Sequence, residues 1–344
     1  MSVFFNGRLI VSPATASLIN DSALQPQSTS VGNVVALVGR ASGGAPKTVL
    51  RFGSPQEAAL ELVSGELLDA VRAAFNPSPE TGGPDTVVVV RVNPAVQATG
   101  VLKDASNNTV VNLTSLNYGQ RENQIQFKVE AGSVSGLRVT TQRGQEYYTK
   151  DNIERRAFSI RYSGSEATAT LTVTASTATL YAPAGTAVAT IDLTQYTTVV
   201  SVVDRINAVA GFSATVLDTS FDAPAYNGLD FITAQDVKTA DYVVKGDLQA
   251  VVDWLNGPTQ AFVRATRATN VGTVPAAVGW TFLSGGSDGV TTFTDWSDAF
   301  TVLQTVDVQW VTPVSSDSAV HALADTHASY MSDVALRERR VICG

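Results

Sequence analysis

Residues 33–41, Asn-Val-Val-Ala-Leu-Val-Gly-Arg-Ala, and residues 87–92, Val-Val-Val-Val-Arg-Val, decide the fold. Each holds a short apolar run, which is typical of a strand buried on both faces. Between them, Ser54-Pro55-Gln56-Glu57 marks a helix start, because serine can cap, proline fits the first helical position and glutamate can complete a capping box. We predict one helix from there to Phe75, whose apolar face carries Leu60, Val63, Leu67, Val71 and Phe75. A strand, a helix and a strand in this order predict a parallel pair with a right-handed crossover.

The end of the chain has the same alternation of strands and helices. We predict strands at Val278–Leu283, Val306–Val311 and Arg340–Cys343, with helices at Asp295–Gln304 and near Asp317–Leu336. Trp296, Phe300 and Leu303 lie on one side of the first of these helices. Residues 8–11, Arg-Leu-Ile-Val, form a short strand-like run near the N-terminus.

Between Pro94 and about Thr273 the sequence alternates threonine and serine with valine and alanine, as in Ala167–Val173 and Thr177–Tyr181. A period of two predicts half-buried antiparallel strands. Two helices interrupt this pattern, Thr198–Ala210, which ends at Gly211, and Gly246–Leu255, which ends at Asn256-Gly257-Pro258.

The predicted fold is therefore an α/β core with a doubly wound, mostly parallel sheet, interrupted by inserted β-rich α+β domains. Residues 1–30 have too few apolar residues to fold alone, and by themselves they indicate a frayed terminus. We place the first part of the core at 31–95, the insertion at 96–274 and the second part of the core at 275–344. This second part ends on a strand that no following helix covers, so we expect it to be incomplete.

The composition restricts the classes of function. A net charge of −8, from 23 basic and 31 acidic residues, argues against a nucleic-acid groove, which needs clustered cations. The single cysteine, Cys343, excludes an internal disulfide framework. The N-terminus lacks the pattern of a signal peptide, and no apolar run reaches the roughly 18 residues of a membrane span. We therefore expect a protein that stays in the cytosol without membrane insertion, and its low charged fraction of 16% suits contacts between copies of the chain.

Residues 39–48 follow a strand and superficially suggest a phosphate loop. A Walker loop needs glycine directly before Lys-Ser/Thr, whereas Pro46 precedes Lys47 here and removes an amide. A dinucleotide fingerprint also needs a helix that begins at the glycines, and this one begins near Ser54. We therefore predict a surface loop.

Gly285-Gly286-Ser287-Asp288-Gly289 matches the G-x-S-x-G pattern of serine hydrolases. Asp317 and then His321 or His327 follow in the order of that catalytic triad. Against this hypothesis, Val290 to Phe293 separate the turn from the next helix, whereas a nucleophile elbow passes straight into one. Asp317 and His321 also share one predicted helix, so they cannot readily converge on a distant serine. We predict a glycine-rich turn whose Ser287 and Asp288 satisfy local amides.

Metal binding is also disfavoured. The two histidines are six residues apart, about 600° around a helix, and so face different ways. We expect them to be solvated or core residues. The spacing around Asp288 and Asp295 does not fit an EF-hand loop. The run from Arg337 to Arg340 is a solvated helix end or a set of partners for acidic patches on a neighbour, and the sequence does not select between the two. We assign no catalytic, cofactor-binding or metal-binding residue.

Several segments, in order, resemble the tail sheath proteins of contractile phages and related injection machines. They are Asn33–Pro46, the strand at 87–92, Asn117–Ile125, the glycine-rich turn at 285–289 leading to Thr294-Asp295-Trp296, His321–Met331 and Arg337–Gly344. The resemblance covers nearly the whole chain. It implies a structural subunit without catalysis or cofactor that polymerises around an inner tail tube and contracts to drive the tube through the host envelope.

The same resemblance implies the partners and the location. They are the inner tube protein, the baseplate, the tail terminator and further copies of the chain. The resemblance implies that residues 1–30 form an extended N-terminal arm, which joins the copies by adding a strand to a neighbour. The protein would be assembled in the host cytoplasm and reside in the virion. Family members continue past the segment matched by Arg337–Gly344, which leaves a fragment, a split sheath or a natural end as explanations. The alternative functions are a serine hydrolase that uses Ser287 and a β-rich virion decoration protein or adhesin.

Overall fold

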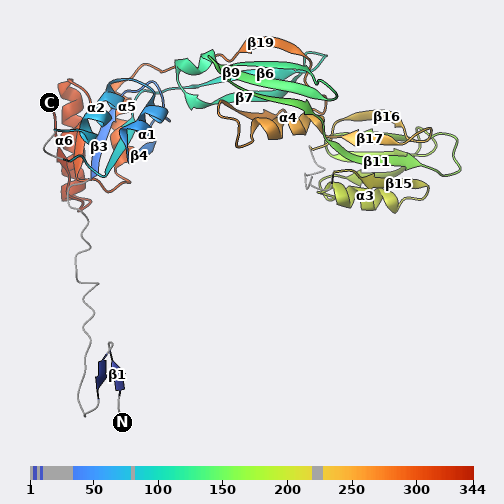
Figure 1. The fold of residues 1–344 in the computed structure, drawn as a ribbon, viewed down its shortest axis with the longest axis horizontal. Helices are drawn as coiled ribbons and strands as arrows, with labels where there is room; N and C mark the ends of the chain where they lie inside the picture. The colour runs from blue at the N-terminus through green and yellow to red at the C-terminus, as the bar shows by residue number, and fades with distance from the viewer. Residues whose placement is uncertain (1–2, 6–7, 11–33, 79–81, 219–227) are drawn as a thin grey trace.

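The computed structural model describes residues 3–5, 8–10, 34–78, 82–218 and 228–344. Figure 1 shows three lobes in a row, which we call the α/β lobe, the middle lobe and the distal lobe. The middle and distal lobes each enclose one apolar core, and the sheet of the α/β lobe has a core on either face. The chain is thus a mixed α/β protein with several separate sheets.

A five-stranded sheet in the order β21-β20-β3-β5-β4 forms the α/β lobe. β3 (Val34–Gly39) pairs in parallel with β5 (Thr86–Arg91) on one side and with β20 (Trp310–Pro313) on the other. The predicted parallel pairing of the two apolar runs is confirmed. β21 (Arg340–Val341) continues the parallel set, whereas β4 (Val49–Phe52), which we did not predict, lies antiparallel at the opposite edge.

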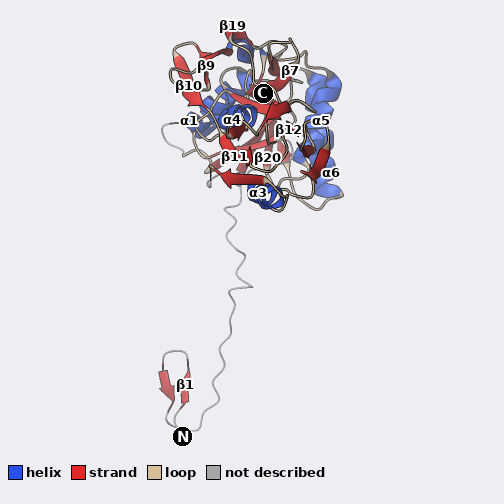
Figure 2. Ribbon diagram, turned by 90° about the vertical axis from the view of Figure 1, so that its right-hand side faces the viewer, coloured by secondary structure: helices blue, strands red, loops and turns tan. Residues whose placement is uncertain are grey.

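Helices cover both faces of this sheet. α1 (Pro55–Leu62) and α2 (Glu66–Phe75) pack with Val87 and Val89, while α5 (Phe293–Leu303) and α6 (Ser318–Asp333) pack with Val88 and Val90. Successive strand residues point to opposite faces, so a strand covered on both sides needs an unbroken apolar run. Figure 2 shows α5 and α6 together on one side of the molecule.

The single helix predicted from Ser54 to Phe75 is wrong, because the structure has two helices there. Ser54 does cap α1, since its side chain accepts the Glu57 N–H. The helix then ends at Val63, whose φ is +64°, and the chain restarts at Gly65 with φ +114°. The loop after β3 causes the break, because the Gly43 and Ser42 amides donate to the carbonyls of Leu62 and Ser64. Leu60, predicted to be buried, is 83% exposed.

The later α/β elements agree with prediction in type and differ in extent. α5 begins two residues early because Thr292 and Asp295 form a capping box, and its buried side includes Trp296, Phe300 and Leu303 as expected. The strand predicted at Val306–Val311 is β20, which begins only at Trp310, and the predicted last strand is limited to Arg340–Val341.

Two antiparallel sheets and α4 (Asp247–Leu255) build the middle lobe. One sheet has the order β10-β9-β8-β19 and the other β18-β7-β6. The strand predicted at Val278–Leu283 exists as β19, but it pairs with β8 and not with the parallel sheet. The prediction that this strand belongs to the α/β core was therefore wrong. Its sequence pattern is that of a strand but fits either kind of sheet. The bounds are β6 (Gln97–Lys103), β7 (Thr109–Tyr118), η1 (Gln120–Gln124), β8 (Gln126–Ala131), β9 (Leu137–Arg143), β10 (Glu146–Ile153), β18 (Val263–Arg267) and β19 (Val278–Phe282).

The distal lobe holds a sheet in the order β14-β13-β12-β16, a sheet in the order β15-β11-β17, and α3 (Val199–Asn207). The predicted alternation is confirmed, because Leu171, Val173, Ala178 and Leu180 are buried on antiparallel neighbours. Thr198 caps α3, as the predicted helix start requires. The bounds are β11 (Arg156–Tyr162), β12 (Thr170–Val173), β13 (Thr177–Tyr181), β14 (Ala187–Asp192), β15 (Phe212–Val216), β16 (Ile232–Asp236) and β17 (Tyr242–Lys245).

Near the N-terminus, β1 (Val3–Phe5) pairs antiparallel with β2 (Arg8–Ile10). β2 confirms the strand-like run expected from Arg8. Most of the predicted arm, residues 1–30, lies outside the described residues, so its extended form stays a prediction. Among the described helices, none is both long and apolar enough to cross a membrane.

Candidate functional site

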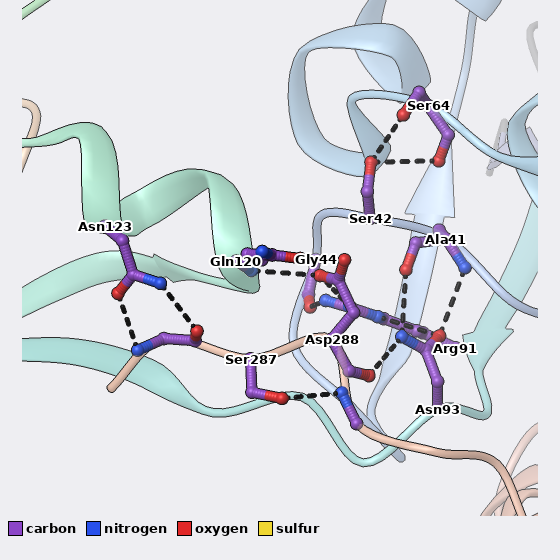
Figure 3. Close-up of polar contacts among 12 residues, drawn as sticks. Ala41, Ser42, Gly44, Ser64, Arg91, Asn93, Gln120, Asn123, Ser287 and Asp288 are labelled. Carbon is purple, nitrogen blue, oxygen red and sulfur yellow. Dashed lines mark hydrogen bonds and ion pairs between the residues drawn. The ribbon is translucent and has the colours of Figure 1, made fainter. Parts of the chain in front are cut away.

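Three segments far apart in the sequence meet where the α/β lobe joins the middle lobe (Figure 3). They are the loop after β3 (residues 40–46), the segment from Gly119 through η1, and the glycine-rich turn at 285–289. We call their contacts, together with Arg91 and Asn93, the proximal joint. All three segments carry the family resemblance, but the sequence predicted only a surface loop at 39–48 and a local turn at 285–289.

Arg91, the last residue of β5, lies at the centre of the proximal joint and is 0% exposed. Its Nη1 donates to the Gly44 carbonyl at 2.7 Å and its Nε to Asn93 Oδ1 at 3.1 Å. Its Nη2 lies 3.6 Å from Asp288 Oδ1 and has no hydrogen-bond partner among the described atoms. Burial lowers the pKa of Arg91, and the carboxylate of Asp288 opposes this effect. Asp288 therefore compensates a cation that burial would otherwise destabilise.

Asn93 ties the loop after β3 to the glycine-rich turn. Its Oδ1 accepts the Ala41 N–H at 3.2 Å, and its Nδ2 donates to the carbonyls of Ala41 at 3.0 Å and Asp288 at 2.7 Å. The side chain is almost fully buried. Each of its polar atoms is thus paired, which makes Asn93 a bridge between a segment 52 positions before it and another 195 positions after it.

The middle lobe holds the same turn from the other side. Asn123 Nδ2 donates to the Gly286 carbonyl and its Oδ1 accepts the Gly286 N–H, both at 2.8 Å. Asp288 Oδ1 accepts the Gln120 N–H at 3.1 Å. At Gly119, with φ +120°, a Cβ would lie 2.5 Å from both the Ser42 carbonyl oxygen and Asp288 Oδ1, so the close approach of the lobes requires glycine here.

Most polar groups of the proximal joint therefore form hydrogen bonds with one another. Ser287 Oγ accepts the Gly289 N–H at 3.1 Å, as predicted for a local turn. Open hollows of about 470 and 520 Å³ flank Asp288. Because most donors and acceptors already have partners, the arrangement is suited to fixing one lobe against the other.

The structure does not assemble the Ser287 triad. Asp317 caps α6 by accepting the Ala319 N–H, and His321 Nε2 lies 2.6 Å from the Ser315 carbonyl oxygen. His327 is buried against Arg339. Among the described residues, no hydrogen bond joins Ser287 to either histidine.

The run at Arg337–Arg340 was predicted as a solvated end or a set of neighbour contacts, and Arg339 contradicts both readings. It is buried, and its Nη1 donates to the Leu303 carbonyl at 3.1 Å and lies 2.6 Å from His327 Nε2. Its Nη2 donates to the Val306 carbonyl. Burial, and then the charge of Arg339, lower the pKa of His327 to about 4. Arg339 thus ties the last segment of the chain to the end of α5, while Arg337, Glu338 and Arg340 are exposed.

The other candidates have structural partners. Lys47, in the loop first compared with a phosphate loop, pairs with Asp295 at 3.0 Å and Asp298 at 2.6 Å. Asp295 also accepts the Thr292 N–H at 2.7 Å in the cap of α5. Asp288 belongs to the proximal joint. These contacts account for the acidic residues that had been weighed as calcium ligands.

A second joint, which we call the distal joint, links the middle lobe to the distal lobe. Asp230 accepts the N–H groups of Asp247 and Leu248 at 2.9 and 3.1 Å and so caps α4, since Gly246 at the N-cap has no side chain. Asp247 accepts the Arg155 N–H at 2.7 Å. Burial raises the pKa of Asp230 to about 6, and the nearby charges of Asp247 and Arg267 act in opposite directions.

Sequence reasoning missed Arg91, Asn93 and Asp230 as joint residues. Arg91 did carry a signal, because it is a charged residue inside a run predicted to be buried on both faces, where a charge needs a partner. Asn93 and Asp230 stand in polar turns, and nothing in their local sequence distinguishes them from exposed turn residues.

The sequence is similar to those of several phage proteins. It is 30% identical to a tail sheath protein of Bacillus phage SP01, over 99% of this chain and 60% of that protein. It is also 30% identical to a putative tail sheath protein of Enterococcus phage phiEF24C, over 93% of this chain and 57% of that protein. A tail sheath protein of Staphylococcus phage Twort is 30% identical over 49% of this chain and 28% of that protein. No family model matches the chain.

Two solved structures were found to be similar to this chain. A sheath tail protein from Listeria innocua gives a TM-score of 0.45 with 15% identity, over 90% of this chain and 46% of that one. A sheath tail protein from Desulfitobacterium hafniense gives 0.43 with 12% identity, over 90% of this chain and 48% of that one.

The chain spans about three-fifths of the length of the first two phage relatives. The resemblance predicted from the glycine-rich turn and the flanking segments is confirmed by these sequence matches. Over nearly its whole length, this chain is a relative of the tail sheath proteins of phages.

Proposed function

We propose that this chain is a structural subunit of a contractile tail sheath, which polymerises around an inner tail tube and contracts to drive the tube through the host envelope. The observation that carries the proposal is the 30% identity to the tail sheath protein of Bacillus phage SP01 over 99% of the chain. The energy for contraction would come from the difference between two packings of the same subunits, so the proposal needs neither catalysis nor a cofactor.

The two joints support this proposal, because contraction by rearranged packing requires subunits that move largely as rigid bodies. At the proximal joint, Asn93 and Asn123 hold the turn at 285–289 from both lobes. At the distal joint, Asp230 caps α4 and Asp247 accepts the Arg155 N–H. Buried polar groups that pair mostly with one another across a joint favour one arrangement of the lobes over others.

We further propose a doubly wound core domain, formed by residues 31–95 and the segment after the glycine-rich turn, with an inserted region from 96 to that turn. The pairing of β19 with β8 is the reason for moving this boundary from 275 toward 285. Residues 1–30 would act as the arm that adds a strand to a neighbouring copy. The remaining partners would be the tube protein, the baseplate and the tail terminator, in a virion assembled in the host cytoplasm.

Immunogold labelling of purified particles tests the sheath role. Antibodies raised against the purified chain should label the tail along its whole length between head and baseplate, in both extended and contracted particles. Particles from an unrelated non-contractile phage are the control. Labelling confined to the head, the fibres or the baseplate would overturn the proposal and favour a decoration protein or adhesin.

A further inference from the structure

The strand β19 is an open edge of the four-stranded sheet in the middle lobe. All five of its residues, Val278 to Phe282, are exposed, and β8 is its only strand neighbour among the described residues. Trp280 is 46% and Phe282 60% exposed. The strand contains no charged residue and no proline, which are the usual features that protect an open edge from pairing. An edge of this kind is a template for another strand.

The opposite edge of the same sheet is β10, which pairs only with β9 among the described strands. Tyr148 points inward, since its ring lies 4.9 Å from that of the buried Phe262, so the adjacent Tyr147 points outward and is 64% exposed. On β8, Phe127 is buried, so Gln126 and its partner Phe282 face outward as well. Both open edges therefore carry exposed aromatic rings on the outer face of the sheet.

The direction of the strands makes the two edges complementary. All neighbours in the order β10-β9-β8-β19 are antiparallel. Because the sheet has an even number of strands, β10 and β19 run in opposite directions. A second copy placed beside the first in the same orientation would bring its β10 antiparallel to β19. Figure 2 shows β19 at the top of the molecule and β10 on its left flank, so the two edges face different ways.

We propose that β19 of one copy pairs with β10 of a second copy, so that this sheet continues from subunit to subunit. The inference rests on the proposed function, because a sheath supplies the second copy. A head-to-tail contact between two different surfaces propagates, as an assembly of many copies requires. Main-chain hydrogen bonds supply the affinity, and Trp280 and Phe282 pack beside Tyr147 across the new pair.

The contact between the two strands is small, and its size indicates what kind of partner can bind there. A stable pair of proteins buries about 800 Å² on each partner, more than one short strand and two rings provide. The edge would therefore fail to hold a separate binding protein by itself. It suits a lattice, where each subunit makes several contacts at once and each contact raises the effective concentration for the others.

Disulfide trapping tests this pairing. In a Cys343→Ser background, which removes the one native thiol, one variant carries Thr281→Cys and another carries Glu146→Cys, both at exposed positions. Opposed residues of antiparallel strands lie about 4.5–5.5 Å apart at Cα, within the range of a disulfide. The matched control replaces Glu146→Cys with Val188→Cys, an exposed residue on β14 of the distal lobe.

Oxidation of an equimolar mixture should give the 281–146 heterodimer well above the share expected from random pairing, and the 281–188 mixture should give only that share. The substitutions Trp280→Ser and Phe282→Ser together should reduce the selective trapping several-fold, whereas Val290→Ser, at another exposed apolar residue, should not.

Equal trapping in the two mixtures would overturn the pairing. If antibodies still label the tail along its length, the sheath role stands and only this contact fails. Selective trapping by a chain that does not label tails would support the contact and overturn the sheath role.

Discussion

Asn93→Ala should loosen the proximal joint more than any other single amide truncation there. The side chain makes four hydrogen bonds, to the Ala41 N–H, the Ala41 carbonyl, the Asp288 carbonyl and Arg91 Nε. Removing it leaves two buried donors unpaired, the Ala41 N–H and Arg91 Nε. The guanidinium of Arg91 would then keep one full hydrogen bond, to the Gly44 carbonyl, because Nη2 already lacks one.

An orphaned buried donor costs about 1–3 kcal/mol, so two of them predict a loss of about 2–6 kcal/mol. A loss near the middle of this range, about 4 kcal/mol, corresponds to a roughly 1,000-fold rise in the population of the opened joint. The three lobes need not unfold together, so a local measurement is more direct than a single unfolding midpoint.

Amide hydrogen exchange provides this local measurement. The N–H groups of Gly286 and Gln120 bind Asn123 and Asp288 across the joint, and both should exchange much faster in Asn93→Ala. Asn112→Ala is the matched control, since Asn112 is exposed on β7 and its side chain makes no hydrogen bond to any residue that the structure describes. Equal exchange rates at Gly286 and Gln120 in the two variants would refute the reasoning that Asn93 holds the lobes together.

Four further predictions concern other parts of the chain. The pKa of His327 is about 4 in the fold and about 6.5 in the unfolded chain, so the unfolded chain binds more protons between these two pH values. The free energy of unfolding should therefore be unaffected by His327 above pH 6.5 and should fall by up to about 3 kcal/mol as the pH drops to 4. Urea midpoints between pH 4 and 8 should show a shallower slope in His327→Gln, and an unchanged slope would contradict this. Asp230 acts in the opposite sense, because its raised pKa of about 6 makes the folded state hold the extra proton. Its effect on the urea midpoint should therefore be a fall as the pH rises from about 4 to about 6, and Asp230→Asn, which does not titrate, should flatten this part of the profile. Arg339→Ala should destabilise the α/β lobe by about 3 kcal/mol by leaving two buried carbonyls unpaired. Arg340→Ala removes an exposed pair with Glu338 and a contact with the Trp310 ring at 5.8 Å, and should lower the midpoint much less. Gly65→Ala should cost about 1–3 kcal/mol because φ is +114° and the new Cβ would lie 3.1 Å from the Arg40 carbonyl oxygen. Gly82→Ala, whose Cβ would have no described atom within 4 Å, should be nearly neutral by the same measurement.

Several elements could be derived from the sequence because their signals are local. The apolar runs at 34–38 and 87–92 gave two parallel strands, since only a strand covered on both faces needs such a run. Ser54, Thr198 and Asp317 gave helix starts, because capping involves residues within one turn. The ordered segments that resemble tail sheath proteins led to the correct relatives.

Local signals failed where a distant segment decided the conformation. The predicted helix from Ser54 to Phe75 is broken at Val63–Gly65 by the loop after β3, and helical periodicity contains no information on that loop. β19 has a strand pattern that fits either sheet, and only its pairing with β8 places it in the middle lobe. The sequence predicts that Arg339 is a solvated charge, yet its side chain is buried and donates to the Leu303 carbonyl at the end of α5.

The sequence by itself determined the parallel core strands, the alternating strands between them, the helix caps and the family to which the chain is related, because each is carried by neighbouring residues or by their order. Only the tertiary structure decided that the loop after β3, η1 and the glycine-rich turn form one joint. Arg91 contacts Gly44 and Asp288, which are 47 and 197 positions away along the chain. Such contacts depend on how the lobes pack, and packing at that range is set by the whole fold rather than by any local pattern.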